Sequence, residues 1–411
     1  MDLVVAGVFA FVYLGMFLGE FPGLRLDRTG IALLGAIVLV ASNRLTMAEA
    51  WNAIDVPTIA LLLGLMVVSA QFRLGGFYAA VTRRLGASPH TPDGLLALVI
   101  VTAGGLSAVL ANDIVCLAMA PVLVELCVRK QLDPVPYLIA LACASNVGSA
   151  GTLIGNPQNM LIGEVLDLSF ARYLFEGGIP AALGLAMVWL IVHFAYAGRW
   201  HRESTPITVD APDFDRWQTA KGLLVVMALV TAFLFWPAPR EIVALAAAGL
   251  LLVSRRMASR EMLGLVDWHL LVLFAGLFIV NAAVARSGLL NGMFMAFCGA
   301  GLDLADAAAL FGVTAVLSNL ISNVPAVMLL LPAARHELAG PILALSSTLA
   351  GNLLIVGSIA NLIVVDQARR LGVEIDWRTH ARVGLPVTLA TLAVAAAWLW
   401  GTSGLTRRRV R

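Results

Sequence analysis

The sequence predicts an all-α polytopic membrane protein made of two inverted repeats of five spans, and its composition is the first observation behind this prediction. Hydrophobic residues make up 60% of the 411 residues and charged residues only 13%, and the mean hydropathy is +0.91. A soluble domain would be about half apolar and about a quarter charged. Apolar runs of roughly 20 residues recur along the chain, which is about the length that crosses a hydrocarbon core.

The second observation is an internal repeat. The stretch SAVLANDIVCLAMAP at 107–121 returns 211 positions later as SNLISNVPAVMLLLP, which aligns Asn112 with Asn323. A second segment, GSAGTLIGNPQNMLI, aligns with AGNLLIVGSIANLI at an offset of 202 and pairs Asn159 with Asn361. Polar interruptions at matching places in two hydrophobic halves are typical of secondary transporters, whose site forms where broken helices of two repeats meet.

The first repeat is predicted at 1–199. Its N-terminal run lacks a basic start and a small-residue cleavage site, so we expect a span rather than a signal peptide. A re-entrant hairpin is predicted at 94–128, where two apolar arms flank a polar tip. Gly and Pro interrupt the fourth span and predict a broken helix at 137–165. The five spans are expected at about 3–19, 29–43, 55–71, 137–165 and 174–198.

The second repeat is predicted at 219–411, after a polar cytoplasmic linker at 200–218 that contains Pro206 and Pro212. It is expected to hold a hairpin at 304–335 and a broken helix at 341–365. Two shorter segments, 77–88 and 287–299, read as interfacial helices beside the hairpins. The five spans are expected at about 219–236, 241–254, 267–284, 341–365 and 384–401.

The orientation follows from the distribution of basic residues. With the N-terminus outside, 18 of the 27 Lys and Arg residues fall in cytoplasmic loops, as the positive-inside rule requires. Five spans in each half then invert the second repeat and place both termini outside. The basic tail at 407–411 is the exception to the rule. We expect a multi-pass protein of the inner (plasma) membrane of a bacterium.

The tip of the first hairpin carries Asn112 and Asp113 at membrane depth. A buried carboxylate is costly there, so it usually pairs with a cation or holds a proton. Asp113 is therefore predicted to be a Na⁺ ligand or a proton carrier. The alternative is that Asp113 only caps the half-helix that follows.

The first broken helix concentrates polar and helix-breaking residues. Carbonyl groups freed at a break suit Na⁺, and N–H groups at a half-helix N-terminus suit an anion. The alternative is that small residues allow close helix packing, which would account for Gly but not for several amides. The predicted site residues here are Ser145, Asn146, Gly148, Thr152, Gly155, Asn156, Pro157 and Asn159.

The second half offers a similar set, with Val324 in the place of Asp113. Its predicted site residues are Ser318, Asn319, Ser322, Asn323, Pro325, Asn352, Gly357, Ser358 and Asn361. Where Na⁺ is the coupling ion, its predicted ligands are Asn112, Asp113, Asn146, Asn323 and Asn352.

Other classes of function find no support. The net charge of +2 gives no reason to expect a nucleic-acid partner. Four cysteines without CxxC spacing suggest neither a metal site nor a disulfide framework. The sequence contains no P-loop, GxSxG or HExxH motif. We therefore expect no enzyme and no cofactor besides Na⁺ or H⁺ as coupling ion.

The tips ANDIV and SNVPA and the runs TLIGNPQNMLIG and GSIANLIV resemble the ion transporter superfamily. This group includes divalent anion/sodium symporters, arsenical pump membrane proteins, citrate-transporter-like permeases and a sodium/proton antiporter branch. In the divalent-anion branch, Ser-Asn-Thr motifs at both tips bind Na⁺ and substrate carboxylates. Here Ala111-Asn112-Asp113 and Ser322-Asn323-Val324 stand at the tips, and neither matches fully.

The AND tip is similar to that of the arsenical pumps, which extrude arsenite or antimonite, and the GNPQN run is more similar to uncharacterised anion permeases. The resemblance implies a scaffold and a transport domain in each protomer of a homodimer, and an elevator motion.

The leading hypothesis is a secondary active transporter of a small inorganic anion or arsenite-like solute, coupled to H⁺ or Na⁺. No Arg or Lys falls at the predicted depth of the site, which favours a singly charged or neutral solute. The first alternative is a cation/proton antiporter in which Asp113 alternates between Na⁺ and H⁺. The second is a Na⁺-coupled di- or tricarboxylate symporter.

Overall fold

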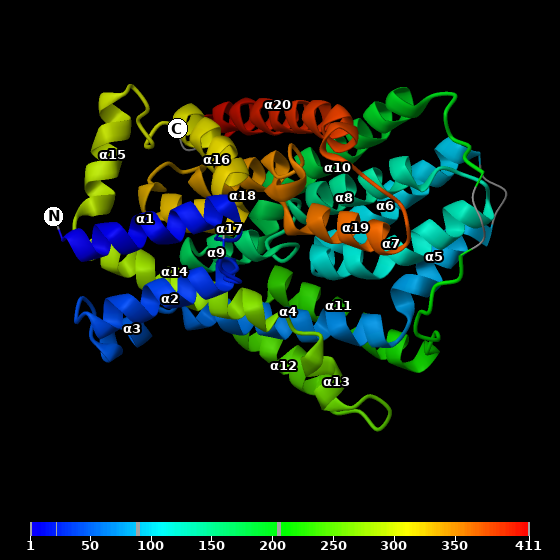
Figure 1. Ribbon diagram of the computed structural model, residues 1–411, viewed down its shortest axis with the longest axis horizontal. Helices are drawn as coiled ribbons and strands as arrows, with labels where there is room; N and C mark the ends of the chain where they lie inside the picture. The colour runs from blue at the N-terminus through cyan, green and yellow to red at the C-terminus, as the bar shows by residue number, and fades with distance from the viewer. Residues whose placement is uncertain (1, 22, 88–90, 204–206, 410–411) are drawn as a thin grey trace.

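The computed structural model describes residues 2–21, 23–87, 91–203 and 207–409, and within these ranges it is helical, with two isolated β-bridges and no strand. The helices of the first half are α1 (Leu3–Leu18), α2 (Arg28–Ala41), α3 (Met47–Ala53), α4 (Val56–Leu74), α5 (Phe77–Ala87), α6 (Pro92–Val109), α7 (Asn112–Arg129), α8 (Pro134–Ser149), α9 (Pro157–Val165) and α10 (Phe170–Tyr196) (Figure 1).

The second half adds ten α-helices and two short 3₁₀ turns within the described ranges. They are α11 (Arg216–Phe235), α12 (Arg240–Leu252), α13 (Ser259–Gly264), α14 (Trp268–Arg286), α15 (Leu289–Gly299), α16 (Ala307–Ile321), α17 (Asn323–Leu330), η1 (Leu331–Ala333), α18 (Ala339–Ala350), η2 (Ile355–Gly357), α19 (Ile359–Arg370) and α20 (Trp377–Arg409).

The helices confirm the predicted class, a polytopic all-α membrane protein. Among the described residues, six helices are long and apolar enough to cross a membrane: α4, α6, α10, α11, α14 and α20. The hairpin segments form the pairs α6–α7 and α16–α17, and the broken helices form α8–α9 and α18–α19. Two short helices, α3 and α13, were not predicted, and α20 starts seven residues before the expected span and continues into the basic tail.

The helices of the second half follow the order of the first. α4 and α14 have 19 residues each, and α5 and α15 have 11. Each pair starts 212 positions apart. The inverted orientation of the two halves, the re-entrant course of the hairpins and the interfacial position of 77–88 and 287–299 stay predictions.

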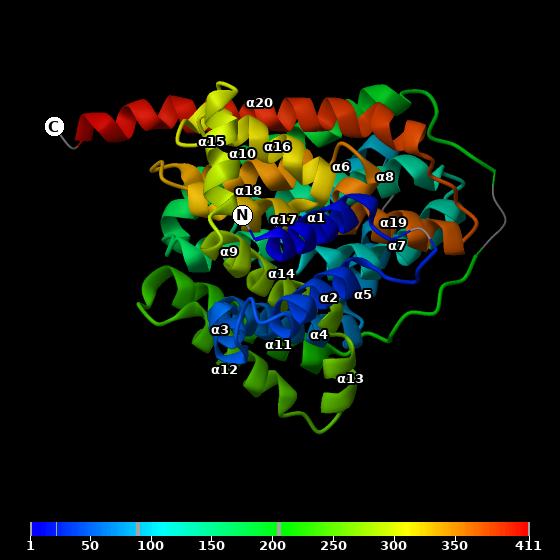
Figure 2. The same cartoon turned by 60° about the vertical axis from the view of Figure 1, so that its left-hand side comes forward.

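Two layers of helices make up the molecule, one above the other in Figures 1 and 2. The lower layer, which we call the scaffold layer, contains α2, α4, α11, α12 and α14. In the upper layer α6 packs against α8, α16 against α18 and α10 against α20. We call this the hairpin layer, and it includes α7, α9, α17 and α19.

The scaffold layer joins the two halves through two matching helix crossings, since α4 packs against α12 and α14 packs against α2. Glycine allows each close approach. A Cβ on Gly64 would lie 2.7 Å from the Ala244 carbonyl carbon, and one on Gly276 would lie 2.8 Å from that of Ala32. Both pairs are related by the offset of 212, so the two crossings use the same register.

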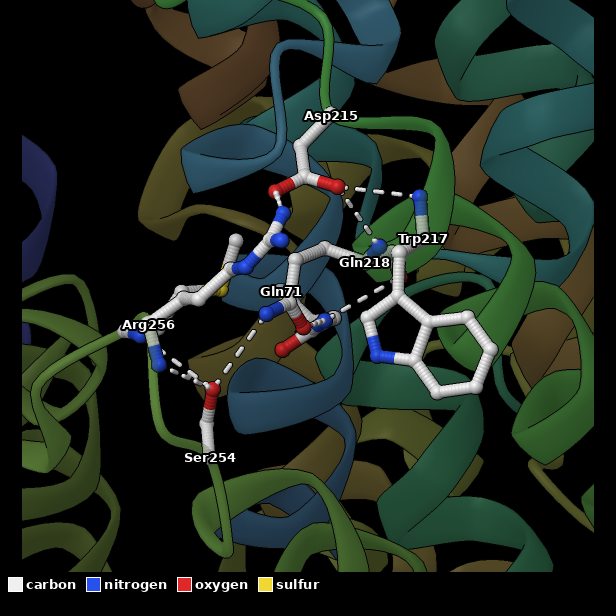
Figure 3. A network of polar contacts seen from close by, with 7 residues as sticks. Gln71, Asp215, Trp217, Gln218, Ser254 and Arg256 are labelled. Carbon is white, nitrogen blue, oxygen red and sulfur yellow. Dashed lines mark hydrogen bonds and ion pairs between the residues drawn. The ribbon is translucent and has the colours of Figure 1, made fainter.

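The linker runs along the end of the molecule opposite to both termini in Figure 1. Its residues 204–206 lie outside the described ranges, as does residue 88 of the segment 77–88. In Figure 3 the linker ends at Asp215, whose carboxylate accepts from the N–H groups of Trp217 (2.9 Å) and Gln218 (3.1 Å). Asp215 also pairs with Arg256 at 3.2 Å. The Gln71 amide donates to the Gln218 side chain at 2.9 Å, so α11 begins at a point fixed to α4 and to the loop before α13.

Candidate functional site

Four helix N-termini meet at a small cavity in the hairpin layer, which we call the central pocket. They belong to α7, α9, α17 and α19. The volume of about 20 Å³ is close to what one water molecule needs. The residues that line it are Asn112, Asp113, Pro157, Gln158, Ser322, Asn323, Val324, Ser358 and Ile359. The two hairpin tips and the two breaks predicted from the sequence therefore lie together.

The first break is built by an amide on each side of Pro157. The Asn156 side chain caps α9 by accepting from the N–H of Asn159 at 2.9 Å, and proline suits the next position because its missing N–H would have no helical partner. The Asn159 amide donates to the carbonyls of Thr152 (2.8 Å) and Ser149 (3.4 Å). It thus satisfies carbonyl groups that the end of α8 leaves free.

The second break repeats this construction. Ser358 caps α19 by accepting from the N–H of Ala360 at 3.2 Å. The Asn361 amide donates to the carbonyls of Gly351 (2.8 Å) and Leu354 (3.0 Å). Asn159 and Asn361, paired by the repeat, thus each brace a break with their amide nitrogen.

Asn146 connects the two broken helices. Its amide nitrogen donates to the side-chain oxygens of Asn352 (2.9 Å) and Asn361 (3.1 Å). Its amide oxygen accepts from Ser358 at 2.9 Å and from Asn112 at 3.4 Å. The five residues form a buried network behind the central pocket, and Asn146 is 1% exposed.

Thr348 stands at the position equivalent to Asn146, 202 residues later. It contacts residues of the first break, as Asn146 contacts residues of the second. It accepts from the amides of Gln158 (3.0 Å) and Asn156 (3.3 Å), and its hydroxyl donates to Asn159 at 3.5 Å. Sequence reasoning missed Thr348 and Gln158. The repeat alignment pointed to the first, because it pairs Thr348 with Asn146.

The tip of the first hairpin presents Asn112 and Asp113. The Asn112 N–H donates to the Gly155 carbonyl at 3.3 Å, and its side-chain oxygen has no partner among the described residues. The Asp113 carboxylate also makes no hydrogen bond with any residue that the structure describes, and α7 has no side-chain cap. The geometry gives no support to a purely capping role for Asp113.

The tip of the second hairpin is Ser322–Asn323. Ser322 has φ +73° and ψ 160°, a backbone conformation that only glycine adopts without strain. With its amide oriented to satisfy both ends, Asn323 donates to the carbonyls of Ser347 (3.1 Å) and Gly357 (3.2 Å) and accepts from Gln158 at 3.3 Å. Strained backbone and a bound amide thus fix this tip against the second break.

Asp113 also lines a second cavity of about 200 Å³ between the two layers, which we call the adjoining cavity. Its other charged lining residues are Arg73, near the end of α4, and Asp267, which caps α14. The remaining walls are mainly apolar side chains. Sequence reasoning missed Arg73 and Asp267, so a guanidinium does lie near the site, although not in the central pocket.

Several predicted site residues lie around the central pocket rather than in its wall. Gly148 packs against Gly104, and a Cβ there would lie 2.2 Å from the Gly104 carbonyl oxygen. A Cβ on Gly155 would lie 2.4 Å from the Ser149 carbonyl oxygen. Three other predicted residues make supporting hydrogen bonds, namely Ser145 with Ser107, Thr152 with the Ala108 carbonyl, and Asn319 with the Ala350 carbonyl. Of the remaining ones, Ser318 is buried, Pro325 lies in the first turn of α17 and Gly357 lies in η2.

The site offers oxygen atoms and helix termini rather than metal-binding side chains. Among the described residues no group of three or more His, Cys, Asp or Glu could hold a metal ion. The polar residues proposed for Na⁺ are nevertheless buried, Asn112 to 5% exposure, Asn323 to 8% and Asn352 to 0%. The side-chain nitrogen of Asn352 has no partner among the described residues.

Comparison with known proteins gives matches that cover most of the chain. Residues 11–341 match the citrate transporter family model, CitMHS. An uncharacterised transporter of Mycobacterium bovis is 30% identical, over 92% of this chain and 94% of the relative. The silicon efflux transporter of Oryza sativa subsp. japonica is 28% identical, over 95% and 96% of the two chains. The putative transporter arsB of Dictyostelium discoideum is 21% identical, over 90% and 87%.

A solved structure shows the same fold. The YdaH transporter of Alcanivorax borkumensis superposes with a TM-score of 0.62, over 98% of each chain, at 16% sequence identity. At this identity the likeness establishes the architecture and leaves the solute open.

Proposed function

The chain belongs to the citrate transporter family and is a multi-pass membrane transporter, and from this premise we propose that it is a secondary active transporter of a small inorganic oxyanion or arsenite-like oxyacid, coupled to H⁺ or Na⁺. The solute binds in the central pocket and is neutral or singly charged.

The observation that carries this proposal is the composition of the central pocket wall. Four helix N-termini contribute partial positive charge, and no Lys or Arg is among the lining residues. Helix termini and amide groups suit the oxygen atoms of a weak oxyacid, whereas a multiply charged anion would need full positive charges as well. The volume of about 20 Å³ also favours a solute of few atoms. A relative named as a silicon efflux transporter and one named arsB agree with this class of solute.

Asp113 is proposed to couple the cycle. It is the acidic residue of the central pocket wall, and it lines the adjoining cavity as well. One carboxylate between two cavities can take up a proton or a cation on one side and release it with the solute. Asn112, Asn146, Asn323 and Asn352 are the further oxygen donors that we propose for a bound Na⁺.

Two alternatives keep specific support. The family name favours a Na⁺-coupled di- or tricarboxylate symporter, for which Arg73 in the adjoining cavity would supply a basic group. The lone carboxylate of Asp113 favours a cation/proton antiporter. The symporter would require the central pocket to widen. The antiporter would leave the polar residues that the second half contributes to the central pocket without a role.

We further propose that the hairpin layer moves against the scaffold layer in an elevator motion, in a homodimer of the bacterial inner membrane with both termini outside. The repeated helix crossings of the scaffold layer support a rigid frame. Orientation can be tested with Thr208→Cys in the linker, because a membrane-impermeant thiol reagent should label it only from the cytoplasmic side. Labelling from outside in intact cells would reverse the assignment.

The function can be tested by counterflow in proteoliposomes. Arsenite, silicic acid, phosphate, sulfate, succinate and citrate should be compared, with and without Na⁺ and a pH gradient. We expect exchange of arsenite or silicic acid and none of citrate. Exchange of citrate or succinate alone, dependent on Na⁺, would replace the proposal by the symporter. Na⁺/H⁺ exchange without any solute would replace it by the antiporter.

A further inference from the structure

We propose that two ion pairs at equivalent positions of the two halves form in alternation and hold the two end states of the transport cycle. One is Arg240–Glu164, which is formed in this structure. The other is Arg28–Asp366, whose members are apart. This inference rests on the proposed alternating transport, and it assigns a role to charged residues outside the central pocket.

The equivalence of the two arginines follows from the scaffold layer. Arg28 starts α2 and Arg240 starts α12, 212 positions later. The close contacts of Ala32 with Gly276 and of Ala244 with Gly64 fix the same register four residues further along each helix. The two arginines therefore occupy the same place in the two helix crossings.

The equivalence of the two acids follows from the broken helices. Asn159 and Asn361 brace the two breaks in the same way. Five residues after each lies an acid, Glu164 near the end of α9 and Asp366 in the later part of α19. Each half thus contributes one arginine in the scaffold layer and one acid in the hairpin layer.

In this structure the first ion pair is formed and the second is not. Arg240 lies 3.2 Å from the Glu164 carboxylate, with side chains 13% and 11% exposed, and 4.0 Å from the carboxylate of the fully exposed Asp167. It also donates to the Gly163 carbonyl at 2.8 Å. Arg28 donates to the Met16 carbonyl at 3.1 Å and joins no ion pair with any described residue. Asp366 is 36% exposed and pairs with two arginines of its own helix, Arg370 at 2.8 Å and Arg369 at 3.5 Å.

This asymmetry is what two repeats in exchangeable conformations produce. Arg240–Glu164 ties α9 of the hairpin layer to α12 of the scaffold layer, so it must break when the layers slide. Losing a largely buried ion pair without replacement would leave one end state poorly populated. Forming Arg28–Asp366 in the other state offsets that loss, because the pair has the same chemistry and an equivalent position. The two states can then have similar free energies, as a cycle that visits both requires.

Cysteine cross-linking tests the alternation directly. In a background with Cys116, Cys127, Cys143 and Cys298 replaced by serine, one variant carries Glu164→Cys with Arg240→Cys and another Arg28→Cys with Asp366→Cys. A short bifunctional thiol reagent should cross-link both pairs in membranes. The mismatched pair Arg28→Cys with Glu164→Cys should not react and serves as the control.

Exclusivity is the decisive result. In a chain that carries the four introduced cysteines at 28, 164, 240 and 366, molecules cross-linked at one pair should resist cross-linking at the other. Failure of 28/366 to react while 164/240 reacts would overturn the proposal, and so would both cross-links in one molecule. The readout needs no transported solute. Exclusive cross-links in a protein that fails every counterflow assay would count against the proposed function only, and active counterflow without the 28/366 cross-link would count against the ion pairs only.

Charge variants give a second, quantitative test. Glu164→Gln should lower the population of the state with Arg240–Glu164 formed, relative to the other state, by about tenfold. Asp366→Asn should raise the population of that same state. The measurement is the labelling rate of Leu117→Cys, which lines the adjoining cavity. The charge reversal Glu164→Arg with Arg240→Glu should restore the original rate. Equal labelling rates of Leu117→Cys with Glu164→Gln, with Asp366→Asn and with neither substitution would overturn the proposal.

Discussion

Asn146 in the first half and Asn361 in the second are joined by a buried hydrogen bond of 3.1 Å. The repeat pairs Asn146 with Thr348 and Asn361 with Asn159. The Thr348 hydroxyl donates to the side-chain oxygen of Asn159 at 3.5 Å. The two broken helices are therefore held to each other at matching depth. Each end of the contact also braces a break or supports a hairpin tip, so local order at the central pocket depends on both halves.

Asn146→Ala should lower stability and abolish transport. The substitution leaves the buried oxygens of Asn352 and Asn361 without their donor, and each unpaired buried group costs about 1–3 kcal/mol. Thermal unfolding in detergent and counterflow measure the two effects. Asn291→Ala, at an exposed position of α15, is the control that should change neither. Unaltered melting and transport in Asn146→Ala would remove the network from both roles.

Asp113→Asn should separate binding from coupling. It keeps the shape of the side chain and removes the titrating carboxylate, so solute exchange should persist while accumulation against a gradient is lost. Uptake should be followed at several pH values with and without Na⁺, with Asp303→Asn in an exposed loop as the control. Accumulation with unchanged pH and Na⁺ dependence would leave Asp113 without a part in coupling.

Ser322→Gly should raise the stability of the protein, whereas Ser322→Ala should not. Glycine relieves the strain of φ +73°, which is worth about 1–3 kcal/mol, at an entropic cost of about 0.5–1 kcal/mol. The glycine variant should therefore melt higher than wild type, while alanine keeps the strain. Both lack the hydroxyl group at the central pocket, so both should transport less. A glycine variant that melts lower would mean that the surrounding contacts, rather than strain, decide the stability of this tip.

Gly148→Ala should destabilise the contact between α6 and α8. Its Cβ would lie 2.2 Å from the Gly104 carbonyl oxygen, and backbone must move to admit it. Overpacking of this kind costs about 1–3 kcal/mol. Gly105→Ala provides a matched comparison, because nothing lies within 4 Å of its Cβ, and alanine there should be neutral or stabilising by up to about 1 kcal/mol. Similar melting temperatures for the two variants would contradict the close approach.

The cap of α11 should respond to acid. The N–H of Gln218, with Arg256 and the N–H of Trp217, holds the pKa of Asp215 below its ordinary value. A lowered pKa in the folded state means that the cap contributes its full stability above the ordinary pKa of about 4, and that this contribution is lost as the pH falls through the lowered value.

The difference in melting temperature between wild type and Asp215→Asn should therefore be present at neutral pH and shrink in acid. Asp213→Asn, two residues earlier in the linker, leaves the contacts of the Asp215 carboxylate in place and is the matched control. A difference that stays constant down to strong acid would mean that the charge of Asp215 contributes nothing to the cap.

The positions of the hairpin tips and breaks could be read from the sequence because their residues have few other uses in an apolar chain. Pro157 between two asparagines cannot continue a helix, and the break begins where the glycines indicate. The capping box at Thr46 and Glu49 also carried a signal for α3, but the helix has only seven residues, too few for a hydrophobic pattern.

The roles of individual residues were less predictable. The sequence cannot show whether an asparagine binds a solute or braces its own backbone, and in Asn159 and Asn361 the amide nitrogen does the second. Arg73 lies 40 residues before Asp113 in the chain, and Asp267 lies 154 residues after it. Only the packing of the two layers brings them beside Asp113.

The helix crossings at Gly64 and Gly276 bear on how the protein is made. α4 leaves the ribosome with its Gly64 face complementary to α12, which is synthesised only after the whole first half and the linker. During this interval that face has no partner from its own chain. Insertion can thus proceed helix by helix, but the scaffold layer closes only when α12 and α14 arrive. A chain that stopped at the linker would retain the hairpin and the break, and would lack a frame to hold them.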